Sequence, residues 1–318
     1  MRVVVVGGGS WGTAFAQLLA EKGNEVVLAC RDGKQARAIA ATHRNARYLP
    51  SAELEGVDAA PLAEAPIAGA DLVALAVPSR AFREVVCALP GSAPVLILTK
   101  GLDPATGSRL SELVTARPVA FLSGPNHAEE IAQQLPAAAV VASADAALAA
   151  AVQDAVHSIR FRVYLNDDLV GVELCAAAKN VMALAAGGVD GLGLGDNAKA
   201  GVISRGLAEM ARLGEACGAR PETFSGLAGM GDLVVTCWSR HSRNRLAGER
   251  IARGESAERV LAEIGQVVEG LTTAPVLRNL AARLGVEVPI TDAVCEVLAG
   301  RTPGALVSSL MARRPTTE

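Results

Sequence analysis

The chain has 318 residues, of which 51 % are hydrophobic and 20 % are charged, and its formal net charge is −3. This composition excludes a disordered chain and is typical of a soluble globular protein with two domains. The slightly negative charge excludes the basic surface that nucleic acid or an anionic membrane would attract, so we expect a small ligand held by a local site.

The six cysteines are scattered, without a CxxC pair or the histidine spacing of a zinc site. We therefore expect reduced core thiols in a cytoplasmic protein and no bound metal. The GGGSWG run interrupts the apolar N-terminal stretch, which argues against a signal peptide. Asp145 interrupts the apolar stretch 137–152, so we expect no insertion into a membrane.

A strand, a glycine-rich turn and a helix are predicted at the start of the chain. Residues 2–6 form a β-branched run typical of a strand buried on both faces, and apolar residues in 11–19 then recur with the helical period. In this context the GxGxxG pattern of Gly7, Gly9 and Gly12 predicts a dinucleotide site. The first glycine permits the turn, the second lets a pyrophosphate approach, and the third lets helix and strand pack closely.

The second predicted strand, 25–30, ends at Arg31 and Asp32. A strict NAD site would carry an acidic residue here, whereas Arg31 offers a cation to the 2′-phosphate of NADP. NADPH is therefore favoured. Asp32 leaves NADH open, and a solvated turn arginine is the plain alternative.

Further strands are predicted at 72–77, 95–99, 119–122 and 138–142, alternating with helices. This order predicts an α/β fold with a Rossmann-like, doubly wound parallel sheet, in which ligands bind at the carboxyl ends of the strands. Lys100 follows one such end and is a candidate ligand-binding residue, although a solvated loop lysine is an equal alternative.

Strand signals fade from about Asp168. We therefore predict a dinucleotide-binding domain over 1–167 and an all-α substrate domain over 168–318. Capping residues and terminal glycines indicate three late helices, one from Ser256 to Ile264, one from Thr273 to Gly285 and one from Thr291 to Gly300.

Lys179 opens a run that predicts two helices joined by a glycine-rich bend, and we expect it to be the only charge on the first helix, in an apolar segment that should be buried. Burial lowers the pKa of an ammonium, which makes a lysine a general acid and base near neutral pH. A core lysine that reaches the surface with its ammonium group is the alternative.

The segment 226–248 is rich in glycine and polar residues. Ser242, Arg243 and Asn244 fall at a predicted helix start, where a cation, an amide and the helix dipole suit a phosphate dianion. An ordinary N-cap followed by a solvated arginine is the alternative. Asp232 either orients a lysine or caps a turn. The four histidines form no hydrolytic triad, and two of them, in glycine- or serine-rich segments, are expected to be solvated.

The chain resembles the bacterial type of NAD(P)-dependent glycerol-3-phosphate dehydrogenase. The resemblance runs from residue 3 to about 297 and departs from the family at Asn126 and His127, where the family often has a serine and a bulky apolar residue. It is carried, in order, by the segments GGGSWGTA, LTKG, SGPNHAEE, KNVMALAAG, GLGLGDNAKA, GLAGMGDL, SRNR and VVEGLTTA.

The resemblance implies reversible reduction of dihydroxyacetone phosphate to sn-glycerol 3-phosphate for phospholipid synthesis, and with it we expect a homodimer. It implies Lys179 as proton donor or acceptor, with Lys100 and Asp232 beside it. The substrate residues it implies are Lys100, Gly124, Lys179, Asp232, Ser242, Arg243 and Asn244. The residues implied to line NADP or NAD, beyond the three glycines, are Ser10, Trp11, Arg31, Lys100, Ala128, Arg243, Val267 and Glu269.

Two other functions remain open at this point. A reductase of a ketoacid or β-hydroxyacid would keep the architecture but hold a carboxylate instead of a phosphate. A regulator that senses NADPH without turnover would explain the glycine turn but not Lys179, Asp232 or Arg243.

Overall fold

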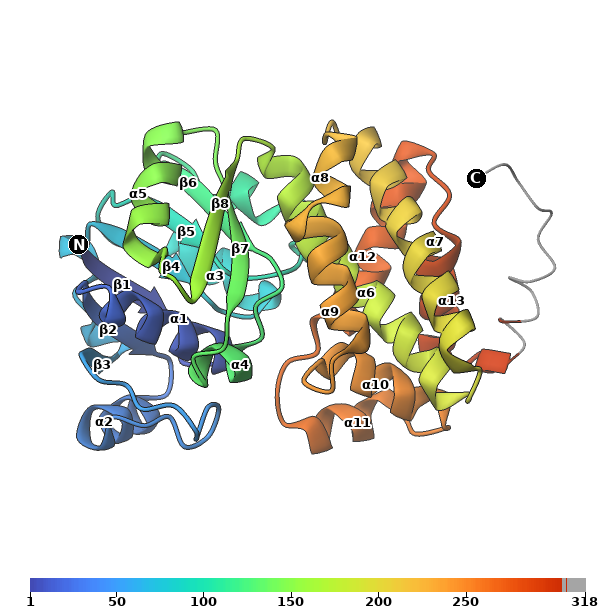
Figure 1. The fold of residues 1–318 in the computed structure, drawn as a ribbon, viewed down its shortest axis with the longest axis horizontal. Coiled ribbons are helices and arrows are strands. Elements are labelled where there is room, and N and C mark those ends of the chain that lie inside the picture. Colours follow the sequence, from blue (N-terminus) through green and yellow to red (C-terminus); the bar gives the residue numbers. More distant parts are fainter. Residues whose placement is uncertain (305–306, 308–318) are drawn as a thin grey trace.

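The computed structural model describes residues 1–304 and 307. Figure 1 shows a sheet flanked by helices in the N-terminal half and a bundle of helices in the C-terminal half. The two halves meet along α6 (Leu169–Gly191), whose first turns pack beneath the sheet and whose remainder forms the centre of the bundle.

The sheet has eight strands. From β1 the chain order runs through β2 and β3 toward one edge, whereas β4 and the later strands follow one another toward the other edge, so the order reverses between β1 and β4. Such a switch point is where open α/β sheets bind ligands. In spatial order the strands are β3 (Val57–Pro61), β2 (Glu25–Cys30), β1 (Arg2–Val6), β4 (Leu72–Leu75), β5 (Val95–Ile97), β6 (Val119–Ser123), β7 (Ala137–Ala142) and β8 (Phe161–Asn166).

The predicted Rossmann-like class is confirmed, with two features that the sequence did not reveal. The short strand β3 and the edge strand β8 were not predicted, because both carry exposed residues and lack a fully apolar run. In addition, β7 is antiparallel to β6, while the other neighbouring pairs are parallel. Strand direction leaves no mark on the periodicity of a strand.

Helices cover both faces of the sheet because β1 is buried on both sides. Val3 and Val5 pack toward one core and Val4 and Val6 toward the other. The first core is covered by α1 (Ser10–Glu21), α2 (Gly33–Thr42), α4 (Ala128–Ala132) and α5 (Ala146–Val156), and the second by α3 (Ser79–Cys87) and the start of α6.

The C-terminal half is helical throughout its described residues, as predicted. After α6 it contains α7 (Gly195–Ala216), α8 (Pro221–Ser225), a π-helical turn (Leu227–Gly231), α9 (Asp232–Trp238), α10 (Arg243–Ala252), α11 (Ala257–Ile264), α12 (Glu269–Leu284) and α13 (Pro289–Leu298). The end of the predicted second domain, 305–306 and 308–318, lies outside the described residues.

Helix α6 is long and apolar enough to cross a bilayer, but 83 % of its most apolar window is buried inside the protein, as in a core helix. It also begins ten residues before Lys179. Lys179 is therefore not its only charge, since Glu173 and Asp190 lie on the same helix.

Two helix starts differ from their prediction because distant side chains cap them. Helix α12 begins at Glu269 rather than after Thr273, and the Asn244 side chain accepts a hydrogen bond from the Gly270 N–H. Helix α13 begins at Pro289, where the Glu209 carboxylate from α7 accepts from the N–H groups of the second and third residues. The predicted ends at Ile264 and Gly285 are confirmed.

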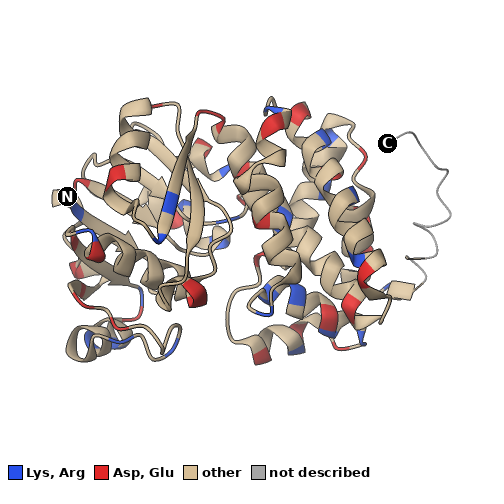
Figure 2. Cartoon of the chain, in the orientation of Figure 1, with Lys and Arg blue, Asp and Glu red and all other residues tan. Residues whose placement is uncertain are grey.

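Charged residues of both signs are interspersed over both halves (Figure 2). The cysteines are free, and four of the six are buried. Cys87, at the end of α3, is exposed, so the expectation of six core thiols is wrong for this residue.

Candidate functional site

The glycine turn between β1 and α1 is shaped to receive a dinucleotide. A Cβ on Gly7, whose φ is +121°, would lie 2.5 Å from the Ala76 carbonyl oxygen, and one on Gly12 would lie 2.0 Å from the Gly7 carbonyl oxygen. Gly9 instead faces open space. The indole N–H of Trp11 is buried without a hydrogen-bond partner among the described residues. An open backbone at a helix start and a free donor fit a pyrophosphate-bearing cofactor.

Neighbouring loops hold this turn in place. The Ser10 hydroxyl donates to the Tyr48 carbonyl (2.8 Å) and to Gln266 Oε1 in the helical half (3.3 Å). The buried Asn45 amide donates to the Gly8 carbonyl at 3.0 Å. These contacts within the chain hold the turn in one conformation, as is usual for small-molecule sites.

Arg31 and Asp32 follow β2, as predicted, and both are exposed. The Asp32 carboxylate accepts from the Lys34 N–H at 2.9 Å and caps α2. Asp32 therefore has a structural role, while the exposed Arg31 lies directly after the end of β2.

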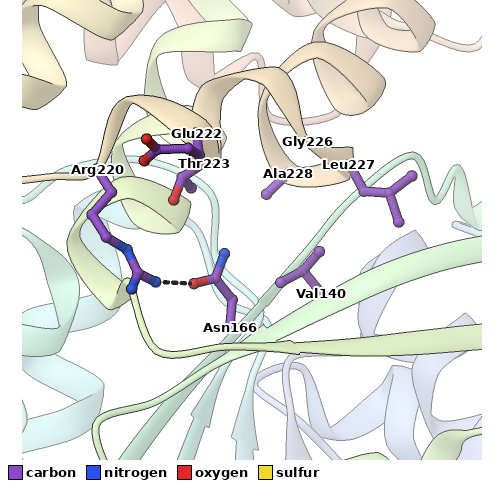
Figure 3. A pocket seen from close by; sticks show the side chains of 8 residues that line it. All are labelled: Val140, Asn166, Arg220, Glu222, Thr223, Gly226, Leu227 and Ala228. Carbon is purple, nitrogen blue, oxygen red and sulfur yellow. Dashed lines mark hydrogen bonds between the residues drawn. The ribbon is translucent and has the colours of Figure 1, made fainter.

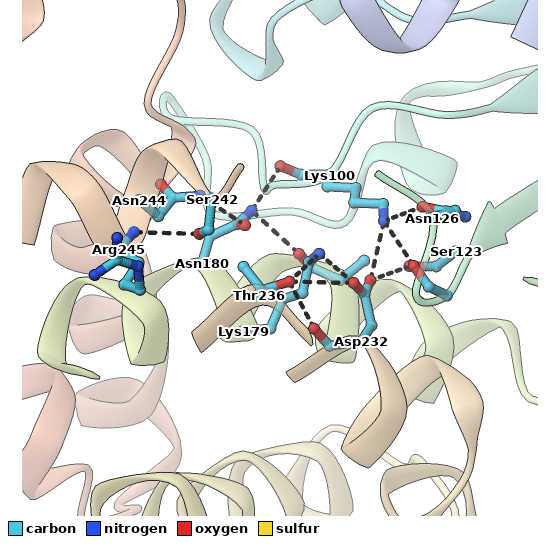
Figure 4. A network of polar contacts seen from close by, with 12 residues as sticks. Lys100, Ser123, Asn126, Lys179, Asn180, Asp232, Thr236, Ser242, Asn244 and Arg245 are labelled. Atoms are coloured by element: carbon cyan, nitrogen blue, oxygen red, sulfur yellow. Dashed lines mark hydrogen bonds and ion pairs between the residues drawn. The ribbon is translucent and has the colours of Figure 1, made fainter. Parts of the chain in front are cut away.

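A buried carboxylate joins the two candidate lysines (Figure 4). Lys179 Nζ on α6 donates to Asp232 Oδ1 at 2.5 Å, and Lys100 Nζ, after β5, donates to Asp232 Oδ2 at 2.9 Å. Lys179 is 5 % exposed and Asp232 is 1 % exposed. The structure thus brings together three residues that are 79 and 53 positions apart in the chain.

The loop after β6 completes the surroundings of Lys100. Its ammonium also donates to the Gly124 carbonyl (3.3 Å) and to Asn126 Oδ1 (3.0 Å). Gly124 has a φ of +142°, and a Cβ there would lie 2.8 Å from the Ala138 carbonyl oxygen. Only glycine lets this loop turn back against β7.

Burial and charge set the protonation of the cluster. Burial, assisted by the charge of Lys100, lowers the pKa of Lys179 to about 7 although Asp232 opposes the shift. Burial alone would raise the pKa of Asp232, but the two ammonium groups outweigh it and lower that pKa to about 2. Asp232 is therefore ionised at neutral pH, while Lys179 can exchange a proton.

The start of α10 lies beside this cluster. Ser242 caps α10 by accepting from the Arg245 N–H at 3.2 Å, and the exposed Arg243 donates to the Val267 carbonyl at 2.9 Å. Asn244 donates to Asn180 Oδ1 at 2.9 Å. These contacts link the predicted phosphate residues to the residue that follows Lys179.

Glycines bring α10 against α6. A Cβ on Gly187 would lie 1.9 Å from the Arg245 carbonyl oxygen, and one on Gly248 would lie 2.0 Å from the Leu184 carbonyl oxygen. The two backbones therefore touch, which places Asn244 within reach of Asn180.

Residues 2–149 match the model of the N-terminus of NAD-dependent glycerol-3-phosphate dehydrogenase, and residues 168–307 match the model of its C-terminus. The chain belongs to this family of dehydrogenases. The glycerol-3-phosphate dehydrogenase (NAD(P)+) of Moorella thermoacetica is 47 % identical and covers 99 % of this chain and 97 % of its own. That of Chlorobium phaeobacteroides is 44 % identical over 100 % of this chain and 99 % of its own.

A solved structure agrees with this membership. The glycerol-3-phosphate dehydrogenase of Coxiella burnetii has a TM-score of 0.94 and 38 % identity, with 98 % of this chain and 99 % of that chain covered. The glycerol-3-phosphate dehydrogenase family therefore accounts for both halves of the chain.

Four residues of this dehydrogenase cluster were not predicted as site residues. Thr236 accepts from Lys179 Nζ at 2.9 Å, and Ser123 donates to Asp232 Oδ2 at 3.1 Å. Signals existed for some of them: Thr236 follows Asp232 by one helical turn, and Ser123 ends a buried strand. The other two are Asn126 and Asn180.

His127 lies in the segment SGPNHAEE, one of the glycine- or serine-rich segments in which the sequence predicts a solvated histidine, but it is half-buried. Its Nε2 is buried without a hydrogen-bond partner in the described part of the chain, and its ring lies 6.0 Å from that of His241. Burial, with the nearby charge of Lys179, lowers the pKa of His127 to about 4. The imidazole is therefore neutral at neutral pH.

A separate cavity of about 380 Å³ is lined in part by the π-helical turn of this dehydrogenase (Figure 3). Its wall includes Arg220, which donates to Asn166 Oδ1 at 3.0 Å, and Val140 from β7. None of the predicted site residues lines it.

Proposed function

We propose that this chain reversibly reduces dihydroxyacetone phosphate to sn-glycerol 3-phosphate with NADPH or NADH, and so supplies glycerophospholipid synthesis. The Lys179–Asp232–Lys100 cluster carries this proposal. It places an ammonium of lowered pKa and a second cation at the carboxyl ends of β5 and β6, in a chain of the glycerol-3-phosphate dehydrogenase family.

Lys179 is the proposed acid and base. The bound cofactor supplies a hydride to the carbonyl carbon of the substrate. Lys179 donates a proton to the carbonyl oxygen during reduction and accepts it during oxidation, since its pKa lies near neutral. Lys100 stabilises the developing negative charge on that oxygen, and Asp232 holds both ammonium groups in place.

The substrate phosphate is proposed to bind at the start of α10. Arg243 supplies a charge and Asn244 an amide, while Ser242 lies at the helix N-cap. Gly124 is proposed to lie beside the substrate, since its carbonyl already contacts Lys100.

The cofactor is proposed to lie on the glycine turn, with Arg31 favouring NADPH. Gly9 and Trp11 support this position through open backbone and a free indole N–H. The other proposed cofactor residues are Gly7, Ser10, Gly12, Lys100, Ala128, Arg243, Val267 and Glu269.

We also propose a boundary between domains at residues 167 and 168, a homodimer and a cytoplasmic location. Asp168 caps α6 directly after β8, which supports the boundary. The interspersed surface charges and the free cysteines are consistent with the location.

Oxidation of NADPH, followed by absorbance, tests the activity. We expect turnover with dihydroxyacetone phosphate, very poor turnover with dihydroxyacetone and none with a ketoacid of similar size. Equal or faster turnover with the ketoacid would overturn the proposal, and tight NADPH binding without turnover of any of the three would indicate a sensor.

A further inference from the structure

The segment that enters α12 contacts both halves of the molecule. Gln266 accepts from Ser10 in the glycine turn, and the Val267 carbonyl accepts from Arg243 at the start of α10. The Gly270 N–H donates to Asn244. The segment therefore lies between the proposed cofactor turn and the proposed phosphate site.

Glu269 makes the most specific contact of this segment. Its Oε1 accepts from the Ser79 N–H at 3.0 Å, and its Oε2 accepts from the Ser79 hydroxyl at 2.6 Å. Ser79 is the first residue of α3, is 1 % exposed and comes from the sheet half. One serine thus holds both oxygens of a carboxylate from the other half.

This pair lies directly beside the loop that carries Lys100. A Cβ on Gly101, which follows Lys100, would lie 3.0 Å from Ser79 Cβ and 3.4 Å from Glu269 Oε2. Glycine at this position leaves room for the serine and the carboxylate to meet. Each carboxylate oxygen has a second lone pair, so Glu269 can accept further hydrogen bonds from hydroxyl groups while Ser79 holds it.

We propose that Ser79 is a positioning residue of the cofactor site, which fixes the Glu269 carboxylate for the hydroxyl groups of the bound dinucleotide. The inference rests on the proposed contact between Glu269 and the cofactor. Without the Ser79 hydroxyl, Glu269 keeps one hydrogen bond and is free to rotate, so binding has to order it again. The expected effect is on cofactor affinity and not on the chemical step.

The chain offers a matched control for this test. The Ser111 N–H donates to Glu173 Oε1 at 2.9 Å, and its hydroxyl donates to Oε2 of the same buried carboxylate. The two contacts from the serine are of the same kind, although Glu173 also accepts from Arg109 Nη1 at 2.9 Å, and neither Ser111 nor Glu173 belongs to the proposed site. Ser111→Ala therefore reports what the loss of such a contact does to the fold alone.

The test is titration of the full-length chain with NADPH, followed by nucleotide fluorescence, for wild type, Ser79→Ala, Glu269→Ala, the double variant and Ser111→Ala. We expect Ser79→Ala to raise the Kd by about 2- to 12-fold, which is the cost of ordering one flexible side chain on binding. In the Glu269→Ala background, adding Ser79→Ala should leave the Kd for NADPH almost unchanged. Ser111→Ala should lower the Tm without changing the Kd.

Steady-state turnover separates positioning from chemistry. The kcat of Ser79→Ala at saturating NADPH should stay within about twofold of wild type while the KM for NADPH rises with the Kd. An unchanged Kd in Ser79→Ala, an equal effect of Ser79→Ala with and without Glu269, or an equal rise in Ser111→Ala would each overturn the inference.

The titration also separates this inference from the proposed function. If wild type binds neither NADPH nor NADH, both fail together. If wild type binds NADPH and Ser79→Ala binds it equally, only the inference fails. If the wild type binds NADPH but does not turn over dihydroxyacetone phosphate, only the proposed function fails. The expected Kd changes can still be tested, because the titration contains no substrate.

Discussion

Lys179 Nζ and Asp232 Oδ1 lie 2.5 Å apart and join the middle of α6 to the first residue of α9. Asp232 also binds Lys100, so one carboxylate faces two ammonium groups in a buried site. A single negative charge cannot neutralise both cations. The excess positive charge is suited to stabilise a substrate oxygen that becomes negative during reduction.

Oxidation and reduction should respond to pH in opposite directions. Oxidation of glycerol 3-phosphate requires the neutral amine of Lys179, so its kcat/KM should rise with pH through about 7, where burial has placed the pKa. Reduction requires the ammonium form, so its kcat/KM should fall over the same range. The measurement is kcat/KM in both directions between pH 5.5 and 9. A kcat/KM for oxidation that is flat over this range would contradict the assigned pKa.

Asp232→Asn should destabilise the fold as well as slow the reaction. The substitution keeps the shape but turns an amide N–H₂ group toward one of the two lysines and removes the counter-ion of Lys100, while Lys179, whose pKa Asp232 raises, loses its proton. Removing one partner of a buried ion pair costs about 3–5 kcal/mol in unfolding free energy. Denaturant unfolding measures this loss.

Asp103→Asn is the control for that change. Asp103 is similarly buried but pairs with a single, half-exposed arginine, Arg83. The loss of unfolding free energy in Asp103→Asn should be clearly smaller than that in Asp232→Asn. Equal losses in the two variants would show that the two lysines do not depend on Asp232 for their charge balance.

Arg243→Ala should weaken use of the phosphorylated substrate. Loss of a charge-assisted contact of about 1.5–3 kcal/mol corresponds to roughly a 10- to 100-fold drop in kcat/KM for dihydroxyacetone phosphate. The drop should largely vanish with unphosphorylated dihydroxyacetone. Arg253→Ala removes an exposed cation just after α10, paired with Glu249, and should change neither. A common drop for both substrates in Arg243→Ala would mean that Arg243 acts through the cofactor or the fold, and that the phosphate binds elsewhere.

Arg31→Asp should shift cofactor preference toward NADH. Arg31 follows β2 and is exposed, so an aspartate there replaces a cation for the 2′-phosphate by an acceptor for ribose hydroxyls. The ratio of kcat/KM for NADPH and NADH should fall below one. An unchanged ratio would remove Arg31 from cofactor selection.

The sequence was sufficient to predict those features that depend on residues close together in the chain. Gly7, Gly9 and Gly12 could be read because the strand and helix around them are legible, and Ser242 and Gly285 mark helix ends by their own chemistry. It was insufficient where a feature depends on a residue far away in the chain. Glu209 on α7 caps the start of α13, and Asn244 on α10 caps the start of α12. The residues of the Ser79–Glu269 pair are 190 positions apart. Long-range pairs of this kind become visible only when the chain is folded.

Turnover of Lys179→Ala with dihydroxyacetone phosphate and NADPH, with the NADPH Kd measured on the same sample, tests the central claim most directly. Lys179 acts in the transition state and lies apart from the glycine turn, so kcat should fall by about 10²- to 10⁴-fold while the Kd stays close to that of wild type. A folded Lys179→Ala variant that keeps near wild-type kcat would contradict the claim that Lys179 is the acid and base.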